Sequence, residues 1–185
     1  MAEKKSYLKG LRVLAVDDEE DVLDTIAEAL ETAAIDRAQD FKTAVKKINE
    51  KTYDLAILDI MGVDGLTLLD KTVEKGIPTV MLTAHALNAE TLLASVRKGA
   101  ISYLPKETLA ELDELLNSLM EAHERGEPTW KLLFDKLGGY FDQRFGPDWQ
   151  ARDRAFWSEF SRNYQIAKGI QERVKHDPRI LDKGI

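Results

Sequence analysis

Residues 11–20 read LRVLAVDDEE, a mostly apolar run that ends in four consecutive acids. A run without polar alternation is typical of a strand that is buried on both faces of a parallel sheet. Similar runs occur at 55–58, 79–82 and 101–104, and a shorter one occurs at 35–39. Segments with apolar residues at helical spacing separate these runs, so the pattern predicts five successive strand–helix units.

Five such units with short connections predict an α/β fold, with a parallel sheet sandwiched between helices. Asn88 is suited to cap a helix that reaches Lys98, and Gly99 is suited to end it. Ligands of sheets of this kind lie beyond the carboxyl ends of the strands. The polar residues that directly follow each strand are therefore the candidates for chemistry.

Five polar side chains follow strands at that edge. Asp17 and Asp18 come after the first strand, Asp59 after the third, Thr83 after the fourth and Lys106 after the fifth. Neighbouring carboxylates repel one another unless a cation neutralises them, and Mg²⁺ prefers oxygen ligands. A carboxylate can also act as a nucleophile toward phosphorus, while an ammonium and a hydroxyl can bind phosphate oxygens. The set predicts a Mg²⁺-dependent phosphoryl-acceptor site.

Each of these residues also has a structural explanation. Acids after a strand complement the dipole of the helix that follows, and an isolated lysine is usually a solvated surface charge. The joint placement of five such residues favours function over chance. A phosphatase of the haloacid dehalogenase type would need a second aspartate two residues after Asp59, and Met61 occupies that position.

Four stretches resemble the receiver domain of two-component response regulators, and the resemblance covers roughly residues 9–122. They read LAVDDEE, YDLAILDIMGVDG, PTVMLTAHA and GAISYLPK. The resemblance implies a flavodoxin-like sheet with strand order 2-1-3-4-5 and the following site residues: Asp59 as phosphoacceptor; Asp17, Asp18, Asp59 and the backbone carbonyl of Met61 as Mg²⁺ ligands; Thr83 as switch hydroxyl; Lys106 as phosphate-pairing lysine; and Tyr103 as an aromatic residue that moves inward on activation.

The resemblance also implies a biological role. Asp59 would accept a phosphoryl group from a histidine kinase or a phosphotransfer protein, and the chain would signal to a downstream protein by direct contact. Enzymatic activity would be limited to self-phosphorylation and autodephosphorylation. A phosphorelay intermediary, which passes the phosphate onward, remains an alternative.

Two features depart from the family pattern. The segment from Asp59 to Gly65 is shorter than usual, which leaves open a pseudo-receiver that is not phosphorylated and acts as an interaction module. The family usually places a proline directly after the lysine, whereas Pro105 precedes Lys106 here and Glu107 follows it. We expect the Lys106–Glu107 peptide bond to be trans, because a cis bond without proline costs about 2.5–4 kcal/mol.

The composition changes near residues 126–128, so we expect a receiver at 1–125 and an α-helical extension at 126–185. Ten of the 14 aromatic residues lie beyond residue 126. The pattern predicts a helix over 129–137, interrupted at Gly138 and Gly139, and a longer helix that opens at Pro147 and ends at Pro178. The aromatic residues either pack on the receiver and on one another or form a docking or homodimer surface, for which the candidates are Trp130, Phe156, Trp157 and Phe160.

Composition excludes some classes and argues against others, including the alternative of a nucleic-acid regulator that uses the C-terminal helices. The chain of 185 residues contains no cysteine, which rules out disulfides and zinc–thiolate sites. The net charge is −7, with a balance of −8 in residues 1–120 and +1 in residues 121–185, and neither part has the basic excess expected for binding nucleic acid. No apolar run is long enough to span a membrane, and no secretory signal is evident. We expect a cytoplasmic protein.

Overall fold

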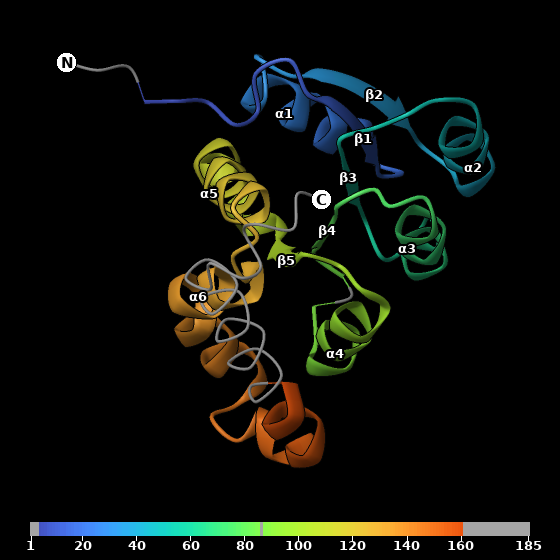
Figure 1. Ribbon diagram of the computed structural model, residues 1–185. Helices are drawn as coiled ribbons and strands as arrows, with labels where there is room; N and C mark the ends of the chain where they lie inside the picture. Colours follow the sequence, from blue (N-terminus) through green and yellow to red (C-terminus); the bar gives the residue numbers. More distant parts are fainter. Residues whose placement is uncertain (1–3, 86, 161–185) are drawn as a thin grey trace, which may run out of the picture.

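The computed structural model describes residues 4–85 and 87–160 and contains a five-stranded parallel sheet (Figure 1). The strand order is β2-β1-β3-β4-β5, so the predicted flavodoxin-like sheet is confirmed. The strands are β1 (Arg12–Val16), β2 (Ala34–Ala38), β3 (Leu55–Leu58), β4 (Thr79–Thr83) and β5 (Ser102–Pro105).

Helices cover both faces of this sheet (Figure 1). One face carries α1 and α5, and the other carries α2, α3 and α4 in that spatial order. The bounds are α1 (Glu20–Ala29), α2 (Phe41–Glu50), α3 (Gly65–Glu74), α4 (Ala89–Lys98), the 3₁₀ helix η1 (Lys106–Glu111) and α5 (Leu112–Glu124). This two-sided covering explains why β3, β4 and β5 are buried along their whole length.

Local signals explain where several helices begin and end. The Asn88 side chain accepts a hydrogen bond of 2.9 Å from the backbone N–H of Thr91, and Gly99 closes α4 at a φ of 97°. A positive φ of this size favours glycine, which has no Cβ. Asp40 caps α2 in the same way, through the backbone N–H of Thr43 at 2.8 Å. The predicted start and end of α4 are confirmed.

The predicted interruption at Gly138 and Gly139 is wrong, because α6 (Thr129–Phe145) continues through both glycines. Glycine inside a helix costs only about 0.5–1 kcal/mol relative to alanine. Trp130 and Leu133 before the pair and Phe141 after it are buried. Burial of one such side chain stabilises by about 1.5–3 kcal/mol, so packing outweighs the glycine penalty.

Beyond α6 the chain turns at Gly146 and forms the 3₁₀ helix η2 (Trp149–Asp153), and residues 154–160 are helical. The long helix predicted from Pro147 therefore begins later and with a 3₁₀ segment. The predicted end at Pro178 lies outside the described residues.

The extension packs against the receiver rather than away from it. Helix α6 lies against β5 and α5 (Figure 1). The indole N–H of Trp130 donates a buried hydrogen bond of 2.8 Å to the carbonyl of Ala100, just before β5. The rings of Tyr103 in β5 and Phe141 in α6 lie 6.2 Å apart between centroids. Arg97 of α4 also pairs with Asp153 at 3.2 Å, so the extension contacts α4 as well.

Two further expectations concern the described residues alone. None of their peptide bonds is cis, in agreement with the trans bond expected after Lys106. No helix among them combines the length and the apolar character needed to cross a bilayer.

Candidate functional site

The carboxyl edge of the sheet brings two buried acids together. Asp17 follows β1 and Asp59 follows β3, and these strands are neighbours in register, with Val16 opposite Leu58. The backbone N–H of Asp59 donates to the carbonyl of Val16 at 2.9 Å, which extends the ladder to the acid itself. The exposed fractions of Asp17 and Asp59 are 1% and 3%, so both carboxyl groups are removed from bulk water.

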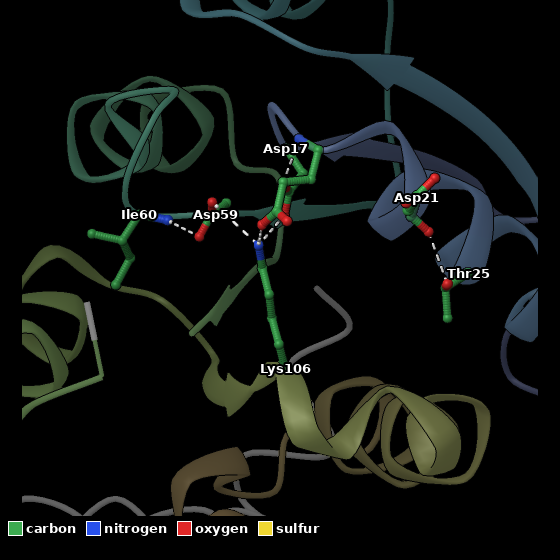
Figure 2. Close-up of polar contacts among 7 residues, drawn as sticks. Asp17, Asp21, Thr25, Asp59, Ile60 and Lys106 are labelled. Atoms are coloured by element: carbon green, nitrogen blue, oxygen red, sulfur yellow. Dashed lines mark hydrogen bonds and ion pairs between the residues drawn. The ribbon is translucent and has the colours of Figure 1, made fainter. Parts of the chain in front are cut away.

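Lys106 lies between these acids, because η1 begins at this residue directly after β5. Its Nζ is 2.8 Å from Oδ2 of Asp17, 2.9 Å from Oε1 of Glu19 and 3.5 Å from Oδ2 of Asp59 (Figure 2). Figure 2 shows the lysine side chain rising from η1 toward the two aspartates. Asp59 and Asp17, which precede Lys106 by 47 and 89 positions in the chain, thus share its one ammonium group.

Asp59 is the carboxyl group of the site whose pKa departs most clearly from its ordinary value. The pKa of Asp59 is raised to about 6, mainly by burial and also by the negative charge of Asp17, while Lys106 opposes both effects. Burial also raises the pKa of Asp17, against the hydrogen bond from Lys106. Burial disfavours the Lys106 ammonium, but its bonds to Asp17 and Glu19 keep its pKa above the ordinary value. The lysine therefore stays charged, while the pKa values of both buried aspartates lie above their ordinary values.

The donor set suits a hard cation. Carboxylate oxygens of Asp17, Asp18 and Glu19 lie within 4.8 Å of one another, and Asp18 and Glu19 are exposed at the mouth of the site. Oxygen-only ligation with open positions for water is what Mg²⁺ requires. The residues present therefore fit a magnesium ion. The sequence analysis did not single out Glu19, although it stands in the same acidic run.

The short segment between Asp59 and Gly65 lies directly over the acids. A Cβ on Gly62 would lie 2.5 Å from Oδ2 of Asp18, and a Cβ on Gly65 would lie 1.8 Å from the backbone oxygen of Asp59. Gly65 requires glycine because a side chain would clash with the backbone of Asp59, and Gly62 favours glycine because its φ of 80° strains any residue with a Cβ. The side chain of Met61 is 54% exposed at this loop. The role of its carbonyl as a metal ligand remains a prediction.

The two proposed switch residues are both buried. Thr83 ends β4, and Tyr103 in β5 is fully buried, with its hydroxyl 2.9 Å from Oγ1 of Thr91 in α4. Burial raises the pKa of Tyr103 to about 12. Phe141 of the extension covers the ring, so Tyr103 occupies an inward position under α6.

The structure brings Asp17, Asp59 and Lys106 into contact at the sheet edge, with Asp18 beside Asp17, and Thr83 ends the neighbouring strand β4. The predicted extension residues lie away from this edge, within the extension. Trp130 and Trp157 are buried within the chain, and Phe156 and Phe160 are half-buried. Phe156 packs on the guanidinium of Arg97, at 4.8 Å from its ring centroid. The aromatic residues of the extension up to Phe160, where the described part ends, form one connected cluster that reaches Tyr103.

A five-stranded parallel sheet with an acid pair, a strand-end aspartate and a facing lysine defines the receiver class. A family model for the response regulator receiver domain matches residues 13–119, which is more than half of the chain. This chain belongs to that family.

Relatives among known proteins agree with this membership. The chain is 36% identical over 102 residues to the transcriptional regulatory protein CutR of Streptomyces coelicolor, a match that covers 52% of this chain and 46% of CutR. It is 30% identical over 124 residues to a protein-glutamate methylesterase of Rhizobium johnstonii, which covers 63% of this chain and 34% of that protein. The chain therefore spans less than half the length of these two relatives.

Solved structures show the same fold. A CheY-like receiver domain protein from Methanospirillum hungatei superposes with a TM-score of 0.57 at 26% identity, covering 64% of this chain and 99% of that one. The receiver domain of the Francisella response regulator 1452 gives a TM-score of 0.54 at 27% identity, covering 62% of this chain and 99% of that one. In both matches, close to two thirds of this chain aligns with nearly the whole of the other structure.

Proposed function

We propose that this chain is a phosphoacceptor response regulator whose Asp59 takes a phosphoryl group from a histidine kinase or a phosphotransfer protein. The observation that carries the proposal is the placement of Asp59: a carboxylate that is 3% exposed, with an ammonium 3.5 Å away and a second acid beside it. Few structural roles need a desolvated carboxylate with so few donors.

The chemistry follows from this arrangement. An Asp59 carboxylate oxygen attacks phosphorus, a new P–O bond forms, and the bond between phosphorus and the donor's nitrogen or oxygen breaks, with its electron pair leaving on the donor. With a pKa of about 6, Asp59 is largely ionised at neutral pH and so can act as the nucleophile. Lys106 and Thr83 would bind phosphoryl oxygens, as an ammonium and a hydroxyl can.

Magnesium is the cofactor that this site would use. Asp17, Asp18 and Asp59 would hold the ion, with the backbone carbonyl of Met61 as a further ligand. When bound, Mg²⁺ would neutralise the acids and the charge that develops on the transferring phosphoryl group. This requirement makes the reaction dependent on a divalent cation.

Output would proceed by protein–protein contact and would involve the extension. Helix α6 covers β5 and Tyr103, and η2 contacts α4 through Arg97. A downstream protein or a second copy of this chain would therefore meet the extension, or a face that the extension exposes. The near-neutral net charge of residues 121–185, a balance of +1, argues against nucleic acid as the partner.

The first experiment is intact-mass analysis after incubation with acetyl phosphate, with and without Mg²⁺. We expect a labile gain of one phosphoryl group that requires Mg²⁺ in the wild type and is absent in Asp59→Asn. No gain together with no Mg²⁺ binding would establish the pseudo-receiver, which the short loop after Asp59 leaves open. Transfer from the phosphorylated chain to a histidine phosphotransfer protein would identify a relay intermediary.

The tryptophans offer a direct test of the extension's part in output. All three lie in the extension, at positions 130, 149 and 157, so their emission reports on this segment alone. We expect phosphorylation to change the emission and its quenching by acrylamide, because Tyr103 and α4 connect the site to the cluster. Asp59→Asn is the control. An identical spectrum before and after phosphorylation would exclude the extension from output.

A further inference from the structure

Glu19 makes a contact that the proposed phosphoryl transfer does not use. Its Oε1 lies 2.9 Å from Nζ of Lys106, nearly as close as Oδ2 of Asp17 at 2.8 Å. Its backbone N–H also donates to Oδ1 of Asp17 at 2.9 Å. Glu19 thus contacts both Lys106 and Asp17 from the exposed rim of the site.

The lysine has a limited number of bonds to give. An ammonium group has three N–H donors. Asp17 and Glu19 occupy two of them at normal hydrogen-bond lengths, and Asp59 lies at 3.5 Å, the longest of the three separations. In this resting arrangement, Lys106 is bound mainly to the acids that are not the phosphoacceptor.

Phosphoryl transfer changes the demand on Lys106. Phosphoryl oxygens at Asp59 would need the ammonium, and an ion held by Asp17 would weaken the Asp17–Lys106 bond. Glu19 would then be the remaining rival, because its carboxylate is 52% exposed and points to the lysine from the mouth of the site. Like charges also make Glu19 and an incoming phosphoryl group repel each other.

We propose, on the basis of the proposed function, that Glu19 is a positioning residue that holds Lys106 at the mouth of the site and competes with phosphoryl oxygens for its ammonium. Glu19 thereby slows entry of the phosphoryl group. The effect is modest, because exposed ion pairs contribute little. Loss of the pair should accelerate phosphorylation by about two- to fivefold, in keeping with the strength of such a pair.

Three variants separate positioning from charge. Glu19→Gln removes the charge and weakens the bond to Lys106. Glu19→Asp keeps the charge but is one methylene too short to reach Nζ in the present geometry. Glu20→Gln is the matched control, because it removes the same charge one residue further on, and Lys106 has no ion pair with Glu20 in the part of the chain that the structure describes.

The primary readout is the second-order rate constant for phosphorylation by acetyl phosphate in saturating Mg²⁺. A second readout involves no chemistry: the affinity for beryllofluoride, a phosphoryl mimic, measured by ¹⁹F NMR. We expect both to rise about two- to fivefold in Glu19→Gln and in Glu19→Asp, with Glu20→Gln unchanged. If Glu19→Asp behaves as the wild type, or Glu20→Gln as Glu19→Gln, overall charge rather than positioning is responsible, and the proposal fails.

Magnesium affinity, measured by calorimetry, provides the last discrimination. We expect Glu19→Gln and Glu20→Gln to bind Mg²⁺ within about twofold of each other, because Glu19, although it lies in the acidic cluster, is bound to Lys106 and is not one of the proposed ligands. A tenfold loss confined to Glu19→Gln would make it a metal ligand and overturn the positioning role. Failure of the wild type to gain phosphate would instead refute the proposed function, so the two failures are distinguishable.

Discussion

Two aspartates on either side of β1, one in β2 and one after β3, show how environment separates a structural acid from a reactive one. Asp36 in β2 accepts hydrogen bonds from Lys47, from Lys51 at 2.8 Å and from the Tyr53 hydroxyl at 2.6 Å. Although burial opposes it, these bonds hold the pKa of Asp36 far below its usual range. Its charge is fully compensated.

Asp59 is more deeply buried but has far fewer donors. It accepts one backbone hydrogen bond of 2.9 Å, from Ile60, and faces the Lys106 ammonium at 3.5 Å. Burial and the negative charge of Asp17 together raise its pKa to about 6, although Lys106 opposes them. The comparison shows that a carboxylate becomes available for chemistry when the fold buries it without supplying enough hydrogen-bond donors to compensate its charge.

The largest expected difference between the two acids is in phosphorylation. Asp59→Asn should abolish the labile phosphoryl gain from acetyl phosphate, because the nucleophile is removed. Asp36→Asn should keep it within a few-fold of the wild type, because its partners Lys47, Lys51 and Tyr53 lie in α2 and just after it and include none of the site residues. Intact mass measures both. Loss of phosphorylation in a folded Asp36→Asn protein would break the comparison.

Asp36→Asn and Asp59→Asn should change the free energy of unfolding in opposite directions. Asp36→Asn should lower the free energy of unfolding by about 1–3 kcal/mol at pH 7, because two ammonium groups and a hydroxyl lose a charged acceptor. Asp59→Asn should raise it by about 1–3 kcal/mol, because it removes a desolvated charge whose pKa the fold has raised. Urea denaturation in a metal chelator measures both, and two shifts of the same sign would contradict this account.

The two acids should also impose opposite pH dependences. The folded pKa of Asp59 is above its unfolded value, so its contribution to stability is present below about pH 4 and is lost as the pH rises through about 6. The advantage of Asp59→Asn over the wild type should therefore grow between pH 4 and pH 7.

Asp36 has a lowered pKa, so its contribution is present above about pH 4 and is lost as the pH falls below that value. The penalty of Asp36→Asn should shrink in acid. Urea midpoints for the three proteins at several pH values test both trends, with chelator present so that no cation binds the site. Parallel pH profiles of the two variants would be inconsistent with the assigned environments.

The smallest effect concerns magnesium. At a Mg²⁺ concentration ten times the dissociation constant, binding should stabilise the wild type by about 1.4 kcal/mol. Asp17→Asn should lose this gain, because it removes a proposed ligand, whereas Asp36→Asn should retain it. Thermal unfolding with and without Mg²⁺ measures the shift. Equal stabilisation of Asp17→Asn and the wild type would remove Asp17 from the metal site.

Much of the receiver was predictable from residue order. Apolar runs without polar alternation are buried on both faces of a sheet, so the strands could be located. Residues that follow parallel strands meet at one edge, so the approach of Asp17, Asp59 and Lys106 to one another could be expected before the structure was known. The caps of α4 were equally local, because Asn88 and Gly99 act on adjacent backbone groups.

The extension was harder to predict, because its outcome depends on partners distant in sequence. Gly138 and Gly139 indicate a break by propensity alone, yet packing on either side keeps α6 continuous. The same packing turns Trp130 from a candidate surface residue into a donor to Ala100. Helix propensity is weak compared with the burial of several aromatic side chains, so tertiary contacts decided the result.

The amino-acid order by itself determined the strand sequence and which side chains reach the carboxyl edge, since strand direction and side-chain alternation are local properties of the backbone. Only the tertiary structure decided how Lys106 divides its hydrogen bonds among Asp17, Glu19 and Asp59, and that α6 covers Tyr103. Those outcomes depend on distances between groups that the chain brings together from far apart, where differences of less than an ångström determine which contact forms.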